Sequence, residues 1–240
     1  MNLARSTLAG GMQRPEENPA TLASRVYGQL RREIITGRHA PGRKLRIQSL
    51  CTQFGVGLSP MREALTRLSR DGLVRHEDQR GFSVAPLDEA HLEELTKTRC
   101  WFNEIGLRES IANGDERWEE GVLLAYHRLS KLPRYLSEDG ISVFNPAWEE
   151  AHRLFHTSLI SACGSRWLID YCGQLFDAAD FYRHVSRVSL IRRKQRENEH
   201  ERIVKATLAR DADTAAGLLT THLRQTAELV RERLAAEAQG

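Results

Sequence analysis

Ser59-Pro-Met-Arg-Glu-Ala-Leu-Thr-Arg-Leu-Ser-Arg-Asp71 is the stretch that decides how this chain folds. Ser59 is a good N-cap, because its hydroxyl can accept a hydrogen bond from a backbone N–H of the first turn, and Pro60 suits the first helical position. Ala64, Leu65 and Leu68 recur at helical spacing and predict an inward face. Asp71-Gly72 predicts the end of the helix, since glycine readily adopts the left-handed conformation there.

The other faces of this predicted helix carry polar and basic residues, namely Arg62, Thr66, Arg67 and Arg70. A short helix with an apolar back and arginines near its start suits the major groove of DNA. The segments on either side support this interpretation. Ile47–Phe54 predicts a short helix, and Gly55-Val-Gly57 joins it to the next one in a helix-turn-helix.

Two short strands are predicted after this helix, at 73–76 and 82–85. The turn between them contains Arg80 and Gly81, so the hairpin resembles a wing whose arginine could contact a phosphate or the minor groove. The alternative is an ordinary three-helix domain with a solvated basic face. A protein-interaction module without a DNA role is a further alternative, which the arginine-bearing helix and the wing disfavour.

The N-terminal segment has two parts. Residues 1–20 lack periodicity and predict a disordered tail, whereas residues 21–36 predict an amphipathic helix. A basic segment follows, in which Arg43, Lys44 and Arg46 are candidate phosphate contacts or simply solvated charges at a domain edge. We therefore expect a winged helix-turn-helix domain at 21–86.

Composition limits the possible classes of protein. The 240 residues carry a net charge of only +3, so a nucleic-acid surface must be local. No apolar run approaches ~18 residues, and no signal peptide is evident, so we expect a cytoplasmic protein with no membrane partner.

The N-terminal third resembles the GntR family of bacterial transcription regulators. The resemblance is carried by Tyr27-Gly-Gln-Leu-Arg-Arg-Glu-Ile-Ile-Thr-Gly37, Ala40-Pro-Gly-Arg-Lys-Leu45, Ser59-Pro-Met-Arg-Glu-Ala-Leu65, Asp71-Gly-Leu-Val74 and Arg80-Gly81. It implies a homodimer that binds double-stranded, palindromic operator DNA, acts as a repressor and is controlled by a small molecule. Leu58 departs from the family, which commonly has a base-reading arginine there, and so one direct contact is expected to be missing.

Residues 87–240 predict an antiparallel bundle of long helices, so the fold class is mainly α. This part resembles the all-helical FCD effector domain found in the FadR-type branch of that family. The predicted helices span 88–112, 115–131, 145–163, 166–186, 188–209 and 212–236.

Four histidines are predicted to face the interior of this bundle: His152, His156, His200 and His222. A buried imidazole needs partners on its nitrogens, and one metal ion can satisfy several at once. The alternative is that each is an ordinary core histidine with hydrogen-bond partners. An imidazole-rich site suits Zn, or Ni or Cu, better than Mg or Ca.

The resemblance to FCD domains, many of which bind metal through an acidic residue and three histidines, favours the metal. His152 departs from that pattern, because the family most often has Asp there, so it implies either a four-histidine site or a neighbouring role for His152. Arg99 resembles a family arginine that pairs with the carboxylate of an organic acid effector. Tyr182 and Arg183 could reach the same cavity, or lie on the surface or in a dimer interface. A helical metal-dependent hydrolase with a winged-helix appendage is the alternative function, but no catalytic motif accompanies the histidines.

Overall fold

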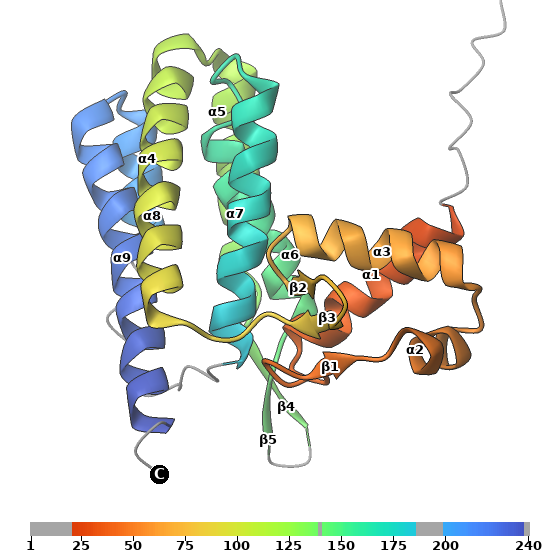
Figure 1. Ribbon diagram of the computed structural model, residues 1–240. Coiled ribbons are helices and arrows are strands. Elements are labelled where there is room, and N and C mark those ends of the chain that lie inside the picture. The colour runs from red at the N-terminus through yellow and green to blue at the C-terminus, as the bar shows by residue number, and fades with distance from the viewer. Residues whose placement is uncertain (1–20, 139–140, 186–198, 238–240) are drawn as a thin grey trace, which may run out of the picture.

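The computed structural model describes residues 21–138, 141–185 and 199–237, and the predicted tail at 1–20 lies outside them. Figure 1 shows a winged-helix part (residues 21–86) packed against the lower side of a bundle of long helices (α4–α9). The predicted fold class, a winged helix-turn-helix followed by a helical bundle, is confirmed. No helix in the described ranges has the length and hydropathy needed to cross a membrane.

The winged-helix part contains three helices and a small antiparallel sheet with strand order β1-β3-β2. Strands β2 and β3 form the predicted wing, in which Val74 pairs with Val84. The short strand β1 was not predicted, and it adds the basic segment to the edge of this sheet through the pair Lys44–Ser83. The elements are α1 (Leu22–Ile35), β1 (Lys44–Leu45), α2 (Ile47–Phe54), α3 (Leu58–Arg70), β2 (Val74–Glu77) and β3 (Gly81–Val84).

Helix α3 begins two residues earlier than the sequence suggested, at Leu58 instead of Pro60. Gly57, in an extended conformation, is its N-cap and provides no side-chain hydrogen bond, so the prediction that Ser59 caps the helix was wrong. Pro60 accordingly lies third in the helix, still within the first turn, where a missing N–H has no helical acceptor to lose. The early start places Leu58 on the helix itself.

The inward face of α3 is completely buried, with Met61, Ala64, Leu65 and Leu68 at 0% exposure. These residues belong to one apolar cluster with Leu30 of α1. Leu→Ala at such a site typically costs about 2–5 kcal/mol of folding free energy. This packing holds the outward face of α3 in a fixed orientation.

The bundle consists of six helices in the described residues, and the predicted helices are found. Asp88, Asp115 and Asn145 each cap a helix by accepting a hydrogen bond from a first-turn N–H, which explains where three of the helices begin. Helix α6 ends earlier than predicted, and the predicted start of α8 at residue 188 lies outside the described residues. The helices are α4 (Glu89–Asn113), α5 (Glu116–Ser130), α6 (Pro146–Leu159), α7 (Arg166–Val185), α8 (Glu199–Leu208) and α9 (Ala212–Glu237).

One hairpin interrupts the bundle and was not predicted. Strands β4 (Tyr135–Glu138) and β5 (Ile141–Phe144) pair antiparallel between α5 and α6. The sequence between them, Asp139-Gly140, was interpreted only as a helix break, although Asp-Gly between alternating apolar residues is a strong hairpin signal.

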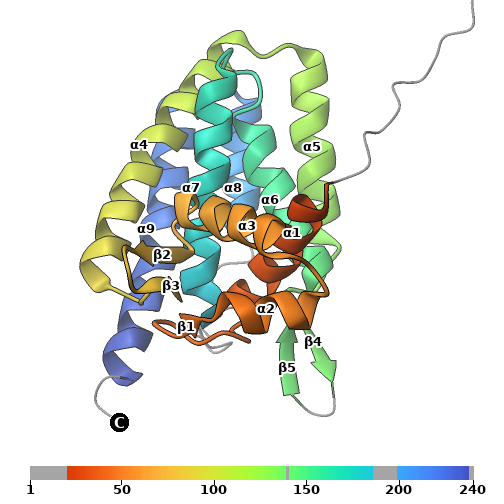
Figure 2. The ribbon, with the colours of Figure 1, turned by 45° about the vertical axis from the view of Figure 1, so that its right-hand side comes forward.

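The two parts share a continuous apolar contact. Leu92, Leu95, Tyr182 and Val230 of the bundle belong to the same buried cluster as the core of the winged-helix part. Figure 2 shows α1 and α3 lying across the lower half of α6 and α7. The winged-helix part therefore lies against helices that also carry the histidines and their neighbours.

Candidate metal and effector site and DNA-binding surface

The predicted histidines meet inside the bundle. His152 and His156 come from α6, His200 from α8 and His222 from α9, and one nitrogen of each lies within 4.8 Å of the others. The pair on α6 is brought together by its i, i+4 spacing, with 3.0 Å between the two Nε2 atoms. Three helices that are separate in sequence thus direct four imidazoles at one point.

Neighbouring side chains hold these rings in place. Trp148 stacks on His152 with a centroid distance of 4.5 Å, and Nδ1 of His222 lies 2.7 Å from a carboxylate oxygen of Glu199. When His222 donates a proton to Glu199, its Nε2 keeps the lone pair that a metal would use. The buried Nε2 of His200 has no hydrogen-bond partner among the described residues. A buried nitrogen without a hydrogen-bond partner is suited to binding a metal ion.

The electrostatics also favour neutral imidazoles. Burial lowers the pKa of His152, His156 and His200 well below the usual value, and the neighbouring histidines lower it further. A metal requires the neutral, lone-pair-bearing form of each ring. The donor set and its protonation therefore fit a borderline-soft divalent ion.

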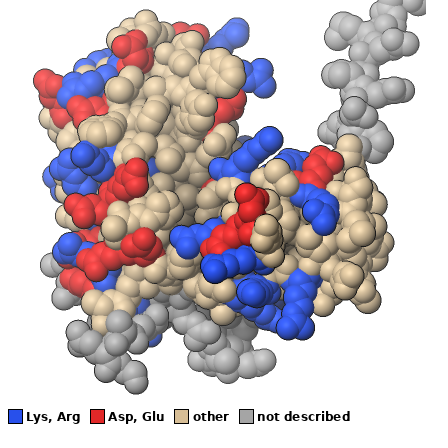
Figure 3. Space-filling view, viewed as in Figure 1, with Lys and Arg blue, Asp and Glu red and all other residues tan. Residues whose placement is uncertain are grey.

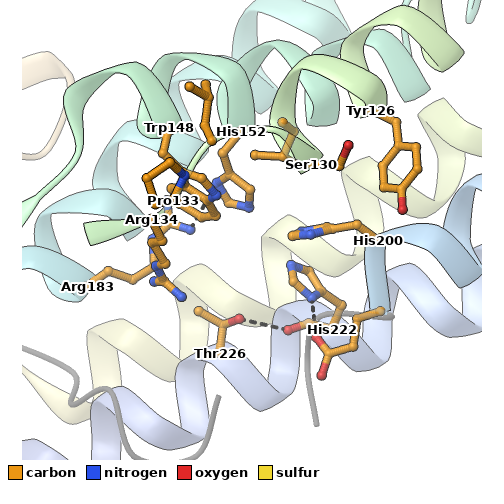
Figure 4. A pocket seen from close by; sticks show the side chains of 13 residues that line it. Tyr126, Ser130, Pro133, Arg134, Trp148, His152, Arg183, His200, His222 and Thr226 are labelled. Carbon is orange, nitrogen blue, oxygen red and sulfur yellow. Dashed lines mark hydrogen bonds and ion pairs between the residues drawn. The ribbon is translucent and has the colours of Figure 1, made fainter. Parts of the chain in front are cut away.

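A cavity of about 450 Å³ opens onto the cluster (Figure 4). Three of the histidines line it: His152, His200 and His222. Two arginines, Arg134 and Arg183, lie on the side that Trp148 occupies, while Tyr126 lies on the other, and Thr226 also lines the cavity. The cavity is therefore lined by a candidate metal-binding cluster, two guanidinium groups and aromatic side chains.

The predicted effector residues lie in three different places. Arg183 lines this cavity, with Nη1 at 3.5 Å from Nδ1 of His152. Arg99 lies beside His156 and lines a separate space of about 10 Å³. Tyr182 does not line the cavity: its hydroxyl bonds to His91 and to the backbone of Asp88, where the two parts of the chain join. Successive residues of α7 point to different sides, so Tyr182 and Arg183 could not both face the histidines.

Arg99 is almost completely buried, and its Nε has no hydrogen-bond partner among the described residues. Burial lowers its pKa to about 10, so the guanidinium keeps its charge at neutral pH. It forms no ion pair with the described residues, and this positive charge lies directly behind His156.

The residues predicted to contact DNA lie mostly on the surface. Arg62 and Thr66 are exposed on α3, Ser59 is exposed in its first turn, and Pro60 is half-buried there. The basic side chains of β1 and of the wing gather below α3 (Figure 3). This group contains Arg43 and Lys44, together with Arg46 before α2 and Arg80 next to the half-buried Gly81 at the wing tip.

Arg67 is the exception. Its guanidinium stacks on the ring of Tyr27 at 4.3 Å and donates a hydrogen bond to Ser24 at 3.1 Å. The hydroxyl of Tyr27 in turn donates to Asp71 at 2.6 Å, and burial with this carboxylate raises the pKa of Tyr27 to about 12. Arg67 therefore packs α3 against α1. The sequence had suggested that its side chain lies on an outer face of α3.

Several residues of the site were missed in the sequence. Glu199 was not assigned to the site, yet it pairs with His222 of the neighbouring helix. Arg134, Trp148 and Tyr126 line the cavity, but Arg134 precedes the hairpin that was not predicted. Only contacts between helices could have identified Glu199 and Tyr126.

Comparison with known families agrees with this architecture. Residues 22–84 match the family described as bacterial regulatory proteins, gntR family, and residues 94–225 match the FCD domain. Together these two matches cover both the winged helix and most of the bundle.

The chain also resembles individual regulators. It is 35% identical to the HTH-type transcriptional regulator BphR of Paraburkholderia xenovorans over 91% of this chain and 89% of that protein. It is 31% identical to the HTH-type transcriptional repressor GlaR of Escherichia coli over 87% of this chain and 96% of that protein.

Solved structures support the same fold. Escherichia coli McbR/YncC superimposes with a TM-score of 0.71 at 17% identity, over 89% of this chain and 99% of that one. The crystal structure of a GntR transcriptional regulator from Rhodococcus sp. RHA1 superimposes with a TM-score of 0.66 at 26% identity, over 88% of this chain and 97% of that one. The hydrolase alternative finds no support, because the family and these relatives are regulators and not enzymes. The chain therefore belongs to the GntR family of bacterial transcription regulators, with an FCD domain after its DNA-binding domain.

Proposed function

We propose that this regulator is a homodimeric repressor whose operator affinity is controlled by a small carboxylic acid bound at a metal ion in the bundle. The observation that carries the proposal is the group of four converging imidazoles, three of which line a cavity that also contains arginine. We divide the chain into a DNA-binding domain at 21–86 and an effector and dimerisation domain at 87–240.

His152, His156, His200 and His222 would hold the metal, which we propose to be Zn, with Ni as the alternative. When bound, the metal would supply a Lewis-acidic centre that can accept an oxygen ligand. The orphaned Nε2 of His200 and the pairing of Glu199 with His222 support this ligand set. Because all four ligands are neutral, the ion would keep its full positive charge.

The effector would enter the cavity of about 450 Å³, a volume suited to a small organic acid. Arg183 faces that space beside His152, so its guanidinium can bind a carboxylate oxygen. Arg99 acts from behind His156 by its charge, because the space beside it holds no more than about one water molecule. Tyr182 is not part of this proposal.

Operator recognition would use α3 in the major groove and the basic group around it. Arg62, Thr66 and the first turn at Ser59 and Pro60 face outward for base and backbone contacts. Arg43, Lys44, Arg46 and Arg80 would bind phosphates beside the groove, with Gly81 shaping the wing tip at a φ of 83°. We exclude Arg67 from this surface because it packs against Tyr27.

The dimer would use the exposed aromatic face of α4 and α7. Trp101 and Trp167 are 55% and 76% exposed, and Tyr171 stacks on Trp167 at 6.4 Å. Large aromatic side chains at this exposure are typical of a surface that a partner covers. Trp167→Glu should give a monomer in analytical ultracentrifugation, whereas Leu154→Glu, an exposed leucine on α6, should leave the dimer intact. An unchanged dimer in Trp167→Glu would place the interface elsewhere.

A thermal-shift screen tests the effector site directly. The purified protein is screened against C4 to C8 carboxylic acids after loading with zinc and again after chelation. A ligand that binds only the folded state raises the melting temperature by mass action. We expect one group of acids to stabilise the zinc-loaded protein and to have no effect after chelation.

The matched variants are His222→Ala, which removes a proposed ligand, and His127→Ala, which removes an exposed histidine of α5. The acid response should disappear in the first and persist in the second. A response that survives both chelation and His222→Ala would show that the acid binds without the metal.

A further inference from the structure

The exposed side of α3 begins with a residue that the proposed function leaves unused. Leu58, Arg62, Thr66 and Arg70 follow each other at intervals of four residues, and all are exposed. They form one row of exposed side chains along the helix, which begins at Leu58 beside the buried Met61 and Leu65 and winds away from the buried face. Leu58 is the only apolar member of that row.

Leu58 is also unusually exposed for its position. Its exposed fraction is 55%, and within residues 21–86 the only other large apolar side chain that is exposed is Leu22, at 42%. The N-cap of α3 is the backbone of Gly57, so Leu58 is the first residue of the helix. In helix-turn-helix proteins the N-terminal residues of this helix contact the base edges.

The chemistry of the groove restricts what a leucine can recognise there. Its side chain neither donates nor accepts a hydrogen bond, and the apolar feature that a base pair presents in the major groove is the C5-methyl group of thymine. We infer that Leu58 packs on a thymine methyl and makes this regulator specific for an A·T pair at that position of each half-site. This inference deepens the proposed operator binding and rests on it.

The position of Arg62 fixes where the thymine should lie. Four residues of an α-helix advance about 6 Å, which corresponds to about two base-pair steps of about 3.4 Å. Arg62 lies one turn after Leu58 in the same row, and an arginine in the major groove pairs best with guanine. We therefore expect a thymine within about two base pairs of a guanine in each half-site.

The test begins with selection of operators from a random duplex library by the full-length protein. One thymine at a time is then replaced by deoxyuridine, which removes only the methyl group. Binding of wild-type protein, measured by fluorescence anisotropy, should weaken about fourfold at one thymine per half-site, as expected for one buried methyl group. Leu58→Ala should bind the thymine and uracil operators equally, whereas Leu22→Ala should retain the wild-type difference.

Leu58→Arg gives a second and independent result, because it should move the preference at that position from thymine to guanine. If operators are selected but no thymine shows a methyl effect that depends on Leu58, this inference is wrong and operator binding stands. If the library yields no operator, the proposed DNA binding fails, and the inference fails with it.

Discussion

At the scale of single residues, burial keeps His152, His156 and His200 uncharged. In the unfolded chain a histidine titrates near pH 6.5, whereas in the folded protein the pKa of each of these three lies well below that value. Below pH 6.5 the unfolded chain therefore binds more protons than the folded one. The stability that the neutral rings contribute is present above pH 6.5 and is lost as the pH falls.

We therefore predict that chelated protein melts at progressively lower temperature between pH 7.5 and pH 5. The slope approaches about 1.4 kcal/mol per pH unit for each histidine that stays neutral in the folded state. His200→Gln, which cannot titrate, should have a shallower slope. A melting temperature that is constant or rises on acidification would show that these histidines are protonated in the folded protein.

At the scale of elements, α3 carries two arginines, about one and a half turns apart, that have different roles. Arg62 is exposed on the outward face, whereas Arg67 stacks on Tyr27 and bonds to Ser24 of α1. The first is available to DNA, and the second fixes the helix that presents it.

Arg62→Ala should weaken operator binding by about 1–3 kcal/mol, the usual contribution of a bidentate arginine–guanine pair, with the melting temperature unchanged. Arg67→Ala should lower the melting temperature of the winged-helix part, because it loses the contact with Tyr27. Anisotropy and differential scanning calorimetry on both variants separate the two effects. The assignment of Arg62 is wrong if its removal leaves operator affinity unchanged.

The features of these elements that depend on neighbouring residues in the sequence could be predicted, and those that depend on contacts with distant segments could not. The apolar stripe of α3, the i, i+4 pair His152–His156 and the helices that carry them follow from local periodicity. The position of Arg67 did not, since it depends on the contact with Tyr27 of α1. Glu199 was left out of the site for the same reason, because its partner His222 lies on another helix.

At the scale of the whole molecule, one carboxylate connects the two parts. Asp177 of α7 forms ion pairs with Arg31 of α1 and with Arg153 of α6. Arg153 directly follows His152, and burial lowers its pKa to about 10, with the charge of Arg31 lowering it further. A shift of α6 at the histidines can therefore reach the winged-helix part through Asp177.

Asp177→Asn should uncouple the two sites, because the two guanidinium groups would then repel each other without a carboxylate between them. The acid should still raise the melting temperature, but its effect on operator affinity should fall several-fold. Asp170→Asn, an exposed carboxylate on the same helix, is the control and should behave as wild type. An undiminished effect in Asp177→Asn would show that the coupling takes another route.

The most direct test of the central claim is operator affinity, measured by fluorescence anisotropy on zinc-loaded and chelated protein with and without the acid found in the screen. We predict that the acid changes the affinity of the zinc-loaded protein by about 5- to 150-fold, the usual range of allosteric coupling, and leaves that of chelated protein unchanged. An equal response in both forms, or no response in either, would contradict a metal-bound effector site that controls DNA binding.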